Sequence, residues 1–342
     1  VSSADQFEVS GALSWEADIW GKIRSSKRAS EASYLQTVAA HHAVKSRLVA
    51  NIASIYYQLM ALDEQIRVTE ETIRTRTEGL ETTIALKEAG NVTEVGVKQT
   101  EAQLYNAQSI LVDLHNQMRI LENTFSILLG SYPDEVNRGK IDEQVIDIPL
   151  RTGVPSQLLR NRPDVIAAEY GLIQAFELTN VARSNFYPAL TLNASGGFQA
   201  LEIEKLFDTG SLFATVVGGL TQPVFNQRRI KTQYEVSQAQ QEQALLNFQN
   251  TLLRAGKEVS DALYTIEAAE EKITIKEKES RAYQLASEYS QELLNNGFAN
   301  YLEVLTAQER ALASSLDMIA AQNNRLQAII DLYEALGGGW KE

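Results

Sequence analysis

The chain has 342 residues and a net charge of −13, and this acidic balance argues against nucleic acid as a partner, because phosphate binding requires a basic surface. It has no cysteine, and no apolar run reaches the length of about 18 residues that a transmembrane helix needs. Six prolines and 19 glycines are few for this length, and the stretches between them are rich in Ala, Leu, Glu, Gln and Lys. This composition predicts long helices.

The first predicted element is a strand. Residues 7–20 alternate between one face that carries Phe7, Val9, Leu13 and Trp15 and another that is polar. A period of two over this length is typical of a half-buried strand. Because Val1–Gln6 lead directly into this strand, we expect the natural N-terminus to lie upstream.

A long helix follows from Lys22 to about Glu88, with apolar residues at alternating steps of three and four. This heptad spacing predicts a coiled coil. At ~1.5 Å per residue the helix is roughly 100 Å long. It ends at the break Glu88–Asn91, and a shorter heptad helix then runs to Leu129-Gly130. A short break between two such helices predicts an antiparallel hairpin.

The second part of the chain repeats this order. After an irregular segment, Pro163-Asp164 is typical of the start of a helix, which we expect to run to about Asn185. Residues 190–198 and 212–222 predict two strands joined as a hairpin. A second long helix is expected from Arg228 to Leu294, followed by a break at Asn295–Gly297 and a last helix.

The two halves are related by a nearly constant offset, since Gly297 lies 207 residues after Gly90, and Leu336-Gly337 answers Leu129-Gly130. An internal repeat on this scale indicates a duplicated architectural unit. Such units build tubes and scaffolds more often than a single active site, so we expect the protein not to be an enzyme.

Large aromatic residues stand in the strands or where strands meet helices: Trp15, Trp20, Phe186, Tyr187 and Phe225. One interpretation is a hydrophobic plug between layers. The other is a belt of membrane-interface aromatics, which lie at the level of the lipid headgroups. The strands are long enough to cross a bilayer when tilted, but three strands are too few to close a barrel. The belt interpretation therefore requires several chains.

Four segments resemble the outer membrane factor family, the TolC/OprM-like outer membrane efflux proteins. They are residues 14–24 at the strand-to-helix turn, residues 162–169 with 182–188 around the following helix, residues 300–308 at the start of the last helix, and residues 333–340 near the C-terminus. Together they span nearly the whole chain in the family's order, and the match is closer to the OprM-like branch. The family's first helices and first strand are absent from this sequence, as is the acylated cysteine of its lipoprotein members.

The resemblance implies a mostly α fold with a small β part: very long coiled-coil hairpins in an α-barrel, and strands of a trimeric transmembrane β-barrel. It implies a homotrimer in the outer membrane of a Gram-negative bacterium, with four strands per protomer in a twelve-stranded barrel. The partners implied are the lipid bilayer, a periplasmic adaptor (membrane fusion) protein and an inner-membrane RND-type or ABC transporter.

On this basis we expect six parts. They are a barrel strand at 1–21, periplasmic coiled-coil helices at 22–130, an equatorial linker at 131–160, a helix at 161–187, a barrel hairpin at 188–225, and periplasmic coiled-coil helices at 226–342.

The hairpin tips are the candidate periplasmic gate and adaptor-docking site, with Gly90, Thr93, Glu94, Gly297, Asn300 and Glu303 as its residues. A gate needs groups that hold one closed arrangement and release it when a partner separates the helices. The alternative for Thr93 and Glu94 is a helix cap and a first-turn acid.

No cofactor, catalytic residue or metal site is expected. The three histidines, His41, His42 and His115, lack metal-ligand spacing and are expected at solvated helix positions. The leading hypothesis is a passive exit duct of a tripartite efflux system, associated with multidrug resistance and opened by an iris-like movement of the helix tips. The alternatives are a type I protein secretion duct and a coiled-coil scaffold without a pore.

Overall fold

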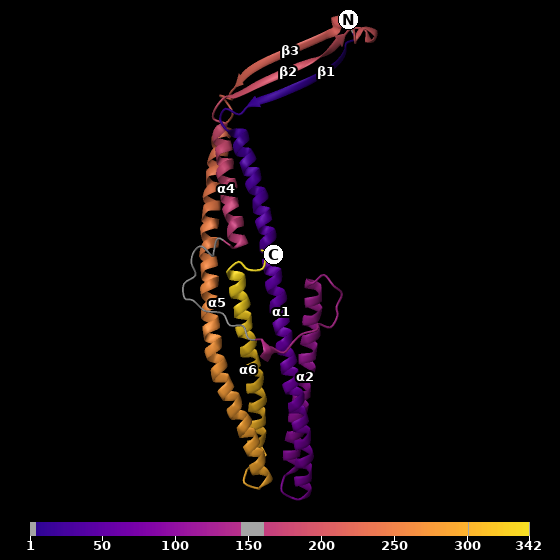
Figure 1. The fold of residues 1–342 in the computed structure, drawn as a ribbon, viewed down its shortest axis with the longest axis vertical. Coiled ribbons are helices and arrows are strands. Elements are labelled where there is room, and N and C mark those ends of the chain that lie inside the picture. The colour runs from indigo at the N-terminus through magenta and orange to yellow at the C-terminus, as the bar shows by residue number, and fades with distance from the viewer. Residues whose placement is uncertain (1–4, 145–160, 300, 342) are drawn as a thin grey trace. The chain divides into compact units, whose positions relative to one another are not determined.

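The computed structural model describes residues 5–144, 161–299 and 301–341 (Figure 1). Its main elements are β1 (Phe7–Ala17), α1 (Lys22–Glu88), α2 (Glu94–Leu128), α4 (Pro163–Ser184), β2 (Ala189–Ala200), β3 (Leu212–Thr221), α5 (Arg229–Asn295) and α6 (Tyr301–Ala335). Short 3-10 turns are η1 (Ile141–Glu143), η2 (Ile203–Lys205) and η3 (Thr209–Ser211). The fold is mostly helical with one small antiparallel sheet, as the sequence predicts.

The chain forms two compact units. The first comprises Val1–His41 and Pro163–Leu252, and the second comprises His42–Arg162 and Leu253–Glu342. The sheet belongs to the first unit and the helical hairpin tips belong to the second. Most of the predicted equatorial linker, from residue 145 to residue 160, lies outside the described residues.

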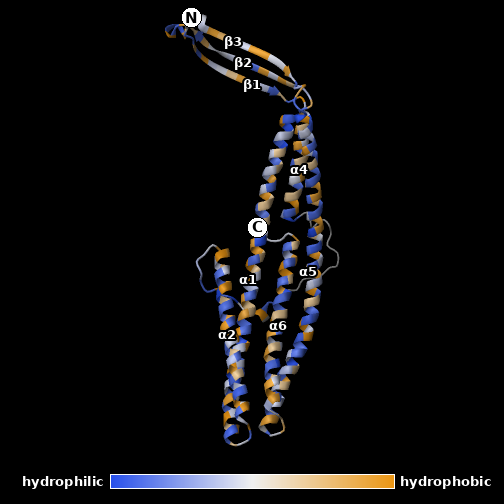
Figure 2. Cartoon of the chain, turned by 180° about the vertical axis from the view of Figure 1, so that it is seen from behind, coloured by the Kyte–Doolittle hydropathy of each residue, from blue (hydrophilic) through white to orange (hydrophobic). Residues whose placement is uncertain are grey.

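The sheet has the order β1-β2-β3, and its register brings most apolar residues of β1 and β2 to one face together with Leu212, Val216 and Leu220 of β3. Phe213 and Val217 of β3 lie on the other face, opposite Gly197 and Asn193. Trp15 pairs with Leu192 and Leu13 with Ala194, which in turn pairs with Val216. Directly paired residues lie on the same side of a sheet. Figure 2 shows that hydrophobic and hydrophilic residues are mixed along the strands. This apolar face is exposed in the chain, with Leu13 68% and Val216 70% exposed.

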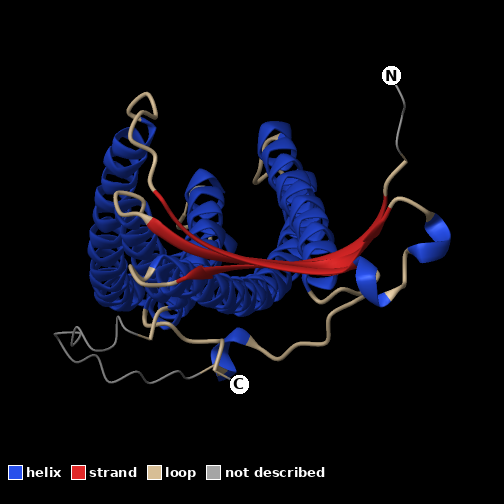
Figure 3. Ribbon diagram, turned by 90° about the horizontal axis from the view of Figure 1, so that it is seen from above, coloured by secondary structure: helices blue, strands red, loops and turns tan. Residues whose placement is uncertain are grey.

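The opposite face of the sheet is mainly polar. Ser14 lies opposite Asn193, and its hydroxyl donates to the Asn193 amide oxygen at 2.7 Å. Gly197 lies at a close approach of β1 and β2, since a Cβ there would come within 2.1 Å of the Val9 carbonyl oxygen. The three strands form one gently curved band in Figure 3. Glycine at position 197 thus serves close strand contact.

The first strand is shorter than its alternating pattern, which extends to Trp20. β1 ends at Ala17 because Asp18 turns away to cap α1, and its carboxylate accepts the main-chain N–H groups of Ile23 and Arg24 at 2.9 and 3.0 Å. Burial alone would raise the pKa of Asp18, but these donors and the Arg24 guanidinium hold it below its ordinary value. Capping at a helix N-terminus thus overrides the strand periodicity.

In the first unit, α4 is held to α1 and α5 by polar contacts. The Arg28 guanidinium of α1 makes a two-pronged contact with the Glu177 carboxylate of α4, at 2.7 and 3.0 Å. The Thr179 hydroxyl donates to the Ser237 carbonyl of α5 at 3.1 Å. The apolar residues of α1 that are buried here are alanines, such as Ala29 and Ala32. Small side chains allow the helix backbones to approach closely.

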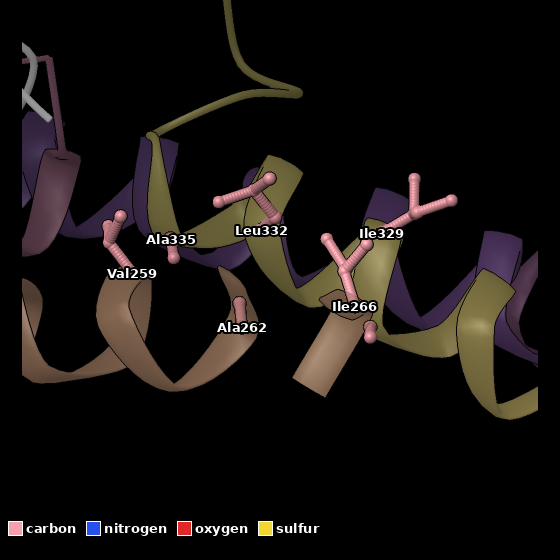
Figure 4. Close-up of a cluster of buried hydrophobic side chains, with 7 residues drawn as sticks. Val259, Ala262, Ile266, Ile329, Leu332 and Ala335 are labelled. Carbon is pink, nitrogen blue, oxygen red and sulfur yellow. The ribbon is translucent and has the colours of Figure 1, made fainter. Parts of the chain in front are cut away.

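In the second unit, α1 with α2 and α5 with α6 form two helical hairpins. The core of the α5–α6 hairpin includes Val259, Ile266, Ile329 and Leu332 (Figure 4). Leu62, Ile66 and Leu114 form the corresponding core of the α1–α2 hairpin. Leu62, Ile66, Leu114, Val259 and Ile266 lie at the predicted heptad positions, whereas Ile329 and Leu332 lie beside them, and the coiled coil stays a prediction.

A third cluster joins the two hairpins. Met60 of α1 packs with Ile319 and Leu326 of α6 and with Ile141 of η1. The segment before η1 is also fixed to the α1–α2 hairpin. The Arg138 guanidinium contacts the carboxylates of Asp63 on α1 and Glu122 on α2. The described part of the linker therefore packs on the helices.

Two of the sequence segments that carry the family resemblance meet in the second unit. The Arg162 guanidinium donates to the Ala335 carbonyl at the end of α6, at 3.1 Å, and pairs with Glu258 of α5 at 2.6 Å. The Trp340 indole N–H donates to the Asn161 carbonyl at 3.1 Å. A Cβ at Gly337, where φ is +80°, would lie 2.7 Å from the same carbonyl oxygen. The two segments thus form one structural joint.

Within the described residues, no helix carries a segment long and apolar enough to cross a membrane.

Candidate functional site

The tip of the first hairpin is closed by local capping. Gly90 has a φ of +82°, and its N–H and that of Asn91 donate to the last carbonyls of α1, those of Lys87 and Leu86, at 2.9 Å. Thr93 is the N-cap of α2, and its hydroxyl accepts the Gly96 N–H at 3.4 Å. This left-handed C-terminal turn followed by a new N-cap is a complete helix-to-helix connection.

Glu94 joins the two helices of the same tip. Its carboxylate forms an ion pair with Lys87 of α1. This hydrogen-bonded pair lowers the pKa of Glu94, and the charge of Lys98 acts in the same direction. Thr93 and Glu94 therefore have the cap and first-turn positions that the alternative interpretation assigns to them. A role in gating stays a prediction for both.

The second tip has the same backbone turn but different side chains. Gly297 has a φ of +78°, and the N–H groups of Gly297 and Phe298 donate to carbonyls of the last turn of α5 at 3.0 and 2.8 Å. Glu303 is an exposed acid in the first turn of α6. Asn300, the other predicted gate residue of this tip, lies outside the described residues.

Tyr301 is the residue that brings the two tips together. A Cβ built on Gly96 of α2 would lie 3.4 Å from Cδ1 of the Tyr301 ring, so this glycine leaves room for the aromatic side chain. The Tyr301 hydroxyl is buried and has no hydrogen-bond partner among the described residues. Burial raises the pKa of Tyr301 to about 12, an effect that Thr83 of α1 partly offsets. Sequence reasoning missed Tyr301, although an aromatic first residue in a helix is an available signal.

The tips also expose large apolar side chains that the sequence pattern does not distinguish. Phe298 is 82% exposed, and Val95 and Leu302 are more than half exposed. These three residues, the tip apolar group, lie in or directly after the turns of the two hairpins. Exposed apolar residues next to a turn that ends a helical hairpin are suited to contact with a protein partner.

Above the tips, a buried arginine lies at the interface between the hairpins. Arg76 of α1 is only 3% exposed, and its guanidinium donates to the Gln103 carbonyl of α2 at 2.5 Å. Its Nε atom has no hydrogen-bond partner among the described residues. Burial lowers the pKa of Arg76, and the charge of Glu309 on α6 partly opposes this.

Arg76 lines a cleft of about 240 Å³ between the hairpins. The other walls include Glu71 of α1, Gln284 of α5, and Gln308 and Ser315 of α6. A largely polar contact of this kind is weaker than an apolar core, because its groups can be satisfied by water when the helices separate.

At the strand–helix junction in the first unit, the structure brings together two of the five predicted aromatics. The Trp20 and Tyr187 rings stack with centroids 4.5 Å apart, and the Trp20 indole N–H donates to the Pro188 carbonyl at 2.9 Å. Phe186 packs edge-on against Tyr234 of α5, with centroids 5.6 Å apart. Trp20, Phe186 and Tyr187 all stay more than two-fifths exposed.

The other two predicted aromatics stand apart from this cluster. Trp15 belongs to the apolar face of the sheet, where it pairs with Leu192. Phe225 is 99% exposed in the loop before α5. The five predicted aromatics therefore do not form one cluster: Trp20 and Tyr187 stack, Phe186 contacts Tyr234, Trp15 lies on the sheet, and Phe225 lies in a loop.

No group of three or more potential metal ligands occurs in the described part of the chain. His115 is exposed, as expected. The expectation for His42 is wrong, because this residue is half-buried and stacks on Trp340 with ring centroids 4.7 Å apart. The stack arises because the C-terminal turn folds back on α1, a contact that local sequence does not encode.

The sequence matches the model of the family described as "Outer membrane efflux protein", over residues 2–131 and 154–338. The cation efflux system protein CusC of Escherichia coli is 25% identical over 338 residues, which is 98% of this chain and 74% of the relative. The pyoverdine export outer membrane protein OpmQ of Pseudomonas putida is 28% identical over 340 residues, or 99% of this chain and 72% of the relative.

Solved structures have the same fold. A crystal structure of CusC superposes with a TM-score of 0.92 at 25% identity, covering 98% of this chain and 78% of the other. The outer membrane protein VceC from Vibrio cholerae gives a TM-score of 0.91 at 22% identity, covering 98% and 87%.

Proposed function

The chain belongs to the outer membrane efflux protein family and is an outer-membrane protein, and we propose that it is the passive exit duct of a tripartite efflux system. The relatives named above are efflux channels rather than enzymes, and the proposed duct has no catalytic role. Their names specify cations and pyoverdine as cargo. This supports small-molecule efflux over the alternative of type I protein secretion.

The observation that carries the proposal is the continuous, exposed apolar face of the sheet. Leu13, Ala194 and Val216 form one row across the three strands, while Ser14 and Asn193 lie on the polar side. An apolar outer face against lipid and a polar lining against water is the pattern of a membrane β-barrel. A scaffold without a pore would have to expose this face to water, which argues against that alternative.

The sheet also requires other chains. Within the described residues β1 and β3 each have one unpaired edge, and three strands cannot close a barrel. Unpaired strand edges in lipid are unfavourable, because their N–H and C=O groups find no water. We therefore propose a homotrimer in which the sheets join into one barrel and the helices line a periplasmic α-barrel.

The hairpin tips are the proposed gate. The contact of Tyr301 with the first hairpin and the half-satisfied Arg76 above it support an iris-like opening, since both lie between hairpins that would separate. The predicted residues Gly90, Thr93, Glu94, Gly297, Asn300 and Glu303 frame this gate. The tip apolar group of Val95, Phe298 and Leu302 is the proposed contact for a periplasmic adaptor, which would link the duct to an RND-type or ABC transporter.

The internal repeat is part of the proposal. α1 and α5 each have 67 residues, and α2 and α6 each have 35. Each helix of the second hairpin begins and ends 207 residues after its counterpart. Equal lengths at a constant offset support a duplication, and the six-part division of the chain stays a proposal.

The test combines native mass in detergent with conductance in planar lipid bilayers. We expect a trimer that forms pores, with opening promoted by an adaptor hairpin. A stable monomer without conductance would overturn the duct, because an open sheet has no way to enclose a pore.

A further inference from the structure

Basic residues concentrate where the helices of the first unit meet the strands. Eight of the 31 Lys and Arg residues of this acidic chain lie in or next to the first two turns of α1, the start of α5 or the end of α4. They are Lys22, Arg24, Lys27, Arg28, Arg183, Arg228, Arg229 and Lys231. A local excess of cations in a chain with a net charge of −13 indicates an anionic partner at this level.

Acidic neighbours neutralise most of the α1 group. Lys22 pairs with Glu16 at 3.2 Å, and Arg24 pairs with Asp18 at 3.0 Å. Arg28 is held by Glu177, as described above.

The start of α5 has no such compensation. Arg228 and Arg229 are exposed and make no ion pair within the described residues, and the first turn of α5 contains no acid. Only Lys231 has a partner, Glu235 at 3.8 Å. The positive end of the α5 dipole adds to the repulsion between these cations. The charge of Arg228 and Arg229 is therefore available to an external anion.

The same loop exposes apolar side chains. Directly before the two arginines, Val224 is 79% exposed and Phe225 is 99% exposed. Gln227 and Arg228 have φ values of 53° and 62°, so the chain turns sharply between the apolar and the cationic residues. Residues 223–231, here named the anchor loop, thus carry an apolar tip followed by two free guanidinium groups.

A cleft lies beside the anchor loop. It has a volume of about 460 Å³, and its walls include Arg229, Asn226 and the stacked Trp20–Tyr187 pair. Lys22, Glu16 and Asp18 also line it; Glu16 pairs with Lys22 and Asp18 with Arg24, so Arg229 is the cation of the cleft that no ion pair neutralises among the described residues. Cationic and aromatic side chains in one concave site suit an amphiphilic ligand, because the ring faces can lie along the apolar–polar boundary.

We propose that the anchor loop binds the phosphate of a phospholipid in the adjacent leaflet of the membrane. Val224 and Phe225 enter the boundary between headgroups and acyl chains, and Arg228 and Arg229 hold the phosphate. This inference depends on the proposed function, since it requires β1, β2 and β3 to lie in the bilayer. It assigns a ligand chemistry to a loop in which the sequence indicated only one aromatic residue.

The test uses the full chain in detergent, titrated with phosphatidylglycerol and followed by native mass spectrometry. The variant R228Q/R229Q is compared with K272Q/K278Q, which removes two exposed, unpaired cations from the same helix, more than about 60 Å further along. We expect R228Q/R229Q to weaken phosphatidylglycerol binding about 30-fold and the control to leave it unchanged. Both sites are exposed, so neither variant should impair folding, and circular dichroism checks this.

Equal lipid binding by the two variants would overturn the proposal. Displacement of the lipid by inorganic phosphate at equal concentration would also overturn it, because the site would then bind free phosphate. Wild-type conductance in planar bilayers tests the duct separately. A wild type that forms no pore, but whose lipid binding is lost in R228Q/R229Q, would overturn the duct and support the lipid site.

Discussion

The two hairpin tips share a backbone and differ in chemistry. Both turn at a glycine with φ near +80° and both start a helix of 35 residues. In the first tip Lys87 pairs with Glu94 across the turn. The positions 207 residues later are Leu294 and Tyr301, and Tyr301 instead contacts the other hairpin. One tip is therefore closed on itself, while the other is closed against its neighbour, which suggests that opening depends mainly on the second.

The largest effect is expected from Tyr301→Ala. It removes the ring that rests against Gly96, and loss of this half-buried aromatic side chain should destabilise the closed arrangement by about 2 kcal/mol. Conductance in planar bilayers should rise and the Tm in detergent should fall. Tyr301→Phe is the matched control and should have a much smaller effect, because it keeps the ring and removes only a hydroxyl whose contact with Thr83 is too long or bent for a regular hydrogen bond.

Because burial raises the pKa of Tyr301, the stability difference between wild type and Tyr301→Phe should depend on pH. The folded pKa is about 12 and the ordinary value is 10.0, so the unfolded chain loses the proton first as pH rises. The contribution of the protonated Tyr301 to the free energy of unfolding is therefore fully present below about pH 10, and it is lost between about pH 10 and 12. Between about pH 10 and 12, the Tm of wild type should fall more steeply with pH than the Tm of Tyr301→Phe. Parallel curves would contradict the burial of this hydroxyl.

Arg76→Met should stabilise the contact between the hairpins. A buried donor without a partner costs about 1–3 kcal/mol, and an apolar side chain of similar length removes the unpartnered Nε–H of Arg76, so we expect a gain of at most this size in the free energy of unfolding. We expect a higher Tm and a lower open probability. Arg74→Met, two positions away on the exposed side of α1, should change neither, because the pair of Arg74 with Glu71 is solvated. A lower Tm for Arg76→Met would mean that the guanidinium has partners in the assembled duct.

Thr93→Ala tests the first tip by removing the N-cap of α2. The hydroxyl accepts one N–H at the long distance of 3.4 Å, so we expect a loss of about 0.5–1 kcal/mol in the free energy of unfolding. Thr93→Ser should restore it. Conductance should stay at the wild-type level, and a large change would show that Thr93 also acts in gating.

Glu94→Gln should have the smallest effect, since both partners of its ion pair are about half exposed. We expect a decrease of about 1 °C in Tm at low salt that disappears at high salt. Because the folded pKa of Glu94 is lowered, its contribution is present above the ordinary pKa of 4.5 and is lost as the pH falls through the folded value. A Tm difference that persists at low pH would contradict this origin.

The sequence predicted the helices and strands more fully than it predicted which side chains contact one another. The alternating pattern of residues 7–17 and the heptads of the long helices specify β1, α1 and α5 closely, because period and length are local properties. The pattern failed at residues 18–20, where capping by Asp18 ends the strand. The capping roles of Thr93 and Glu94 were foreseen as an alternative. Tyr301, Arg76 and the tip apolar group were missed, since their positions depend on contacts between hairpins.

What the sequence by itself determined is the set of elements, their order and their repetition, because hydrophobic period, caps and glycine turns act over a few residues. Only the tertiary structure decided that the apolar rows of β1 and β2 join on one face, since their register depends on pairing between segments more than 170 residues apart. It also decided that Arg162 meets Ala335 and that His42 meets Trp340. The burial of Arg76 and Tyr301 has the same origin: two hairpins distant in sequence pack together and exclude water from whatever lies between them.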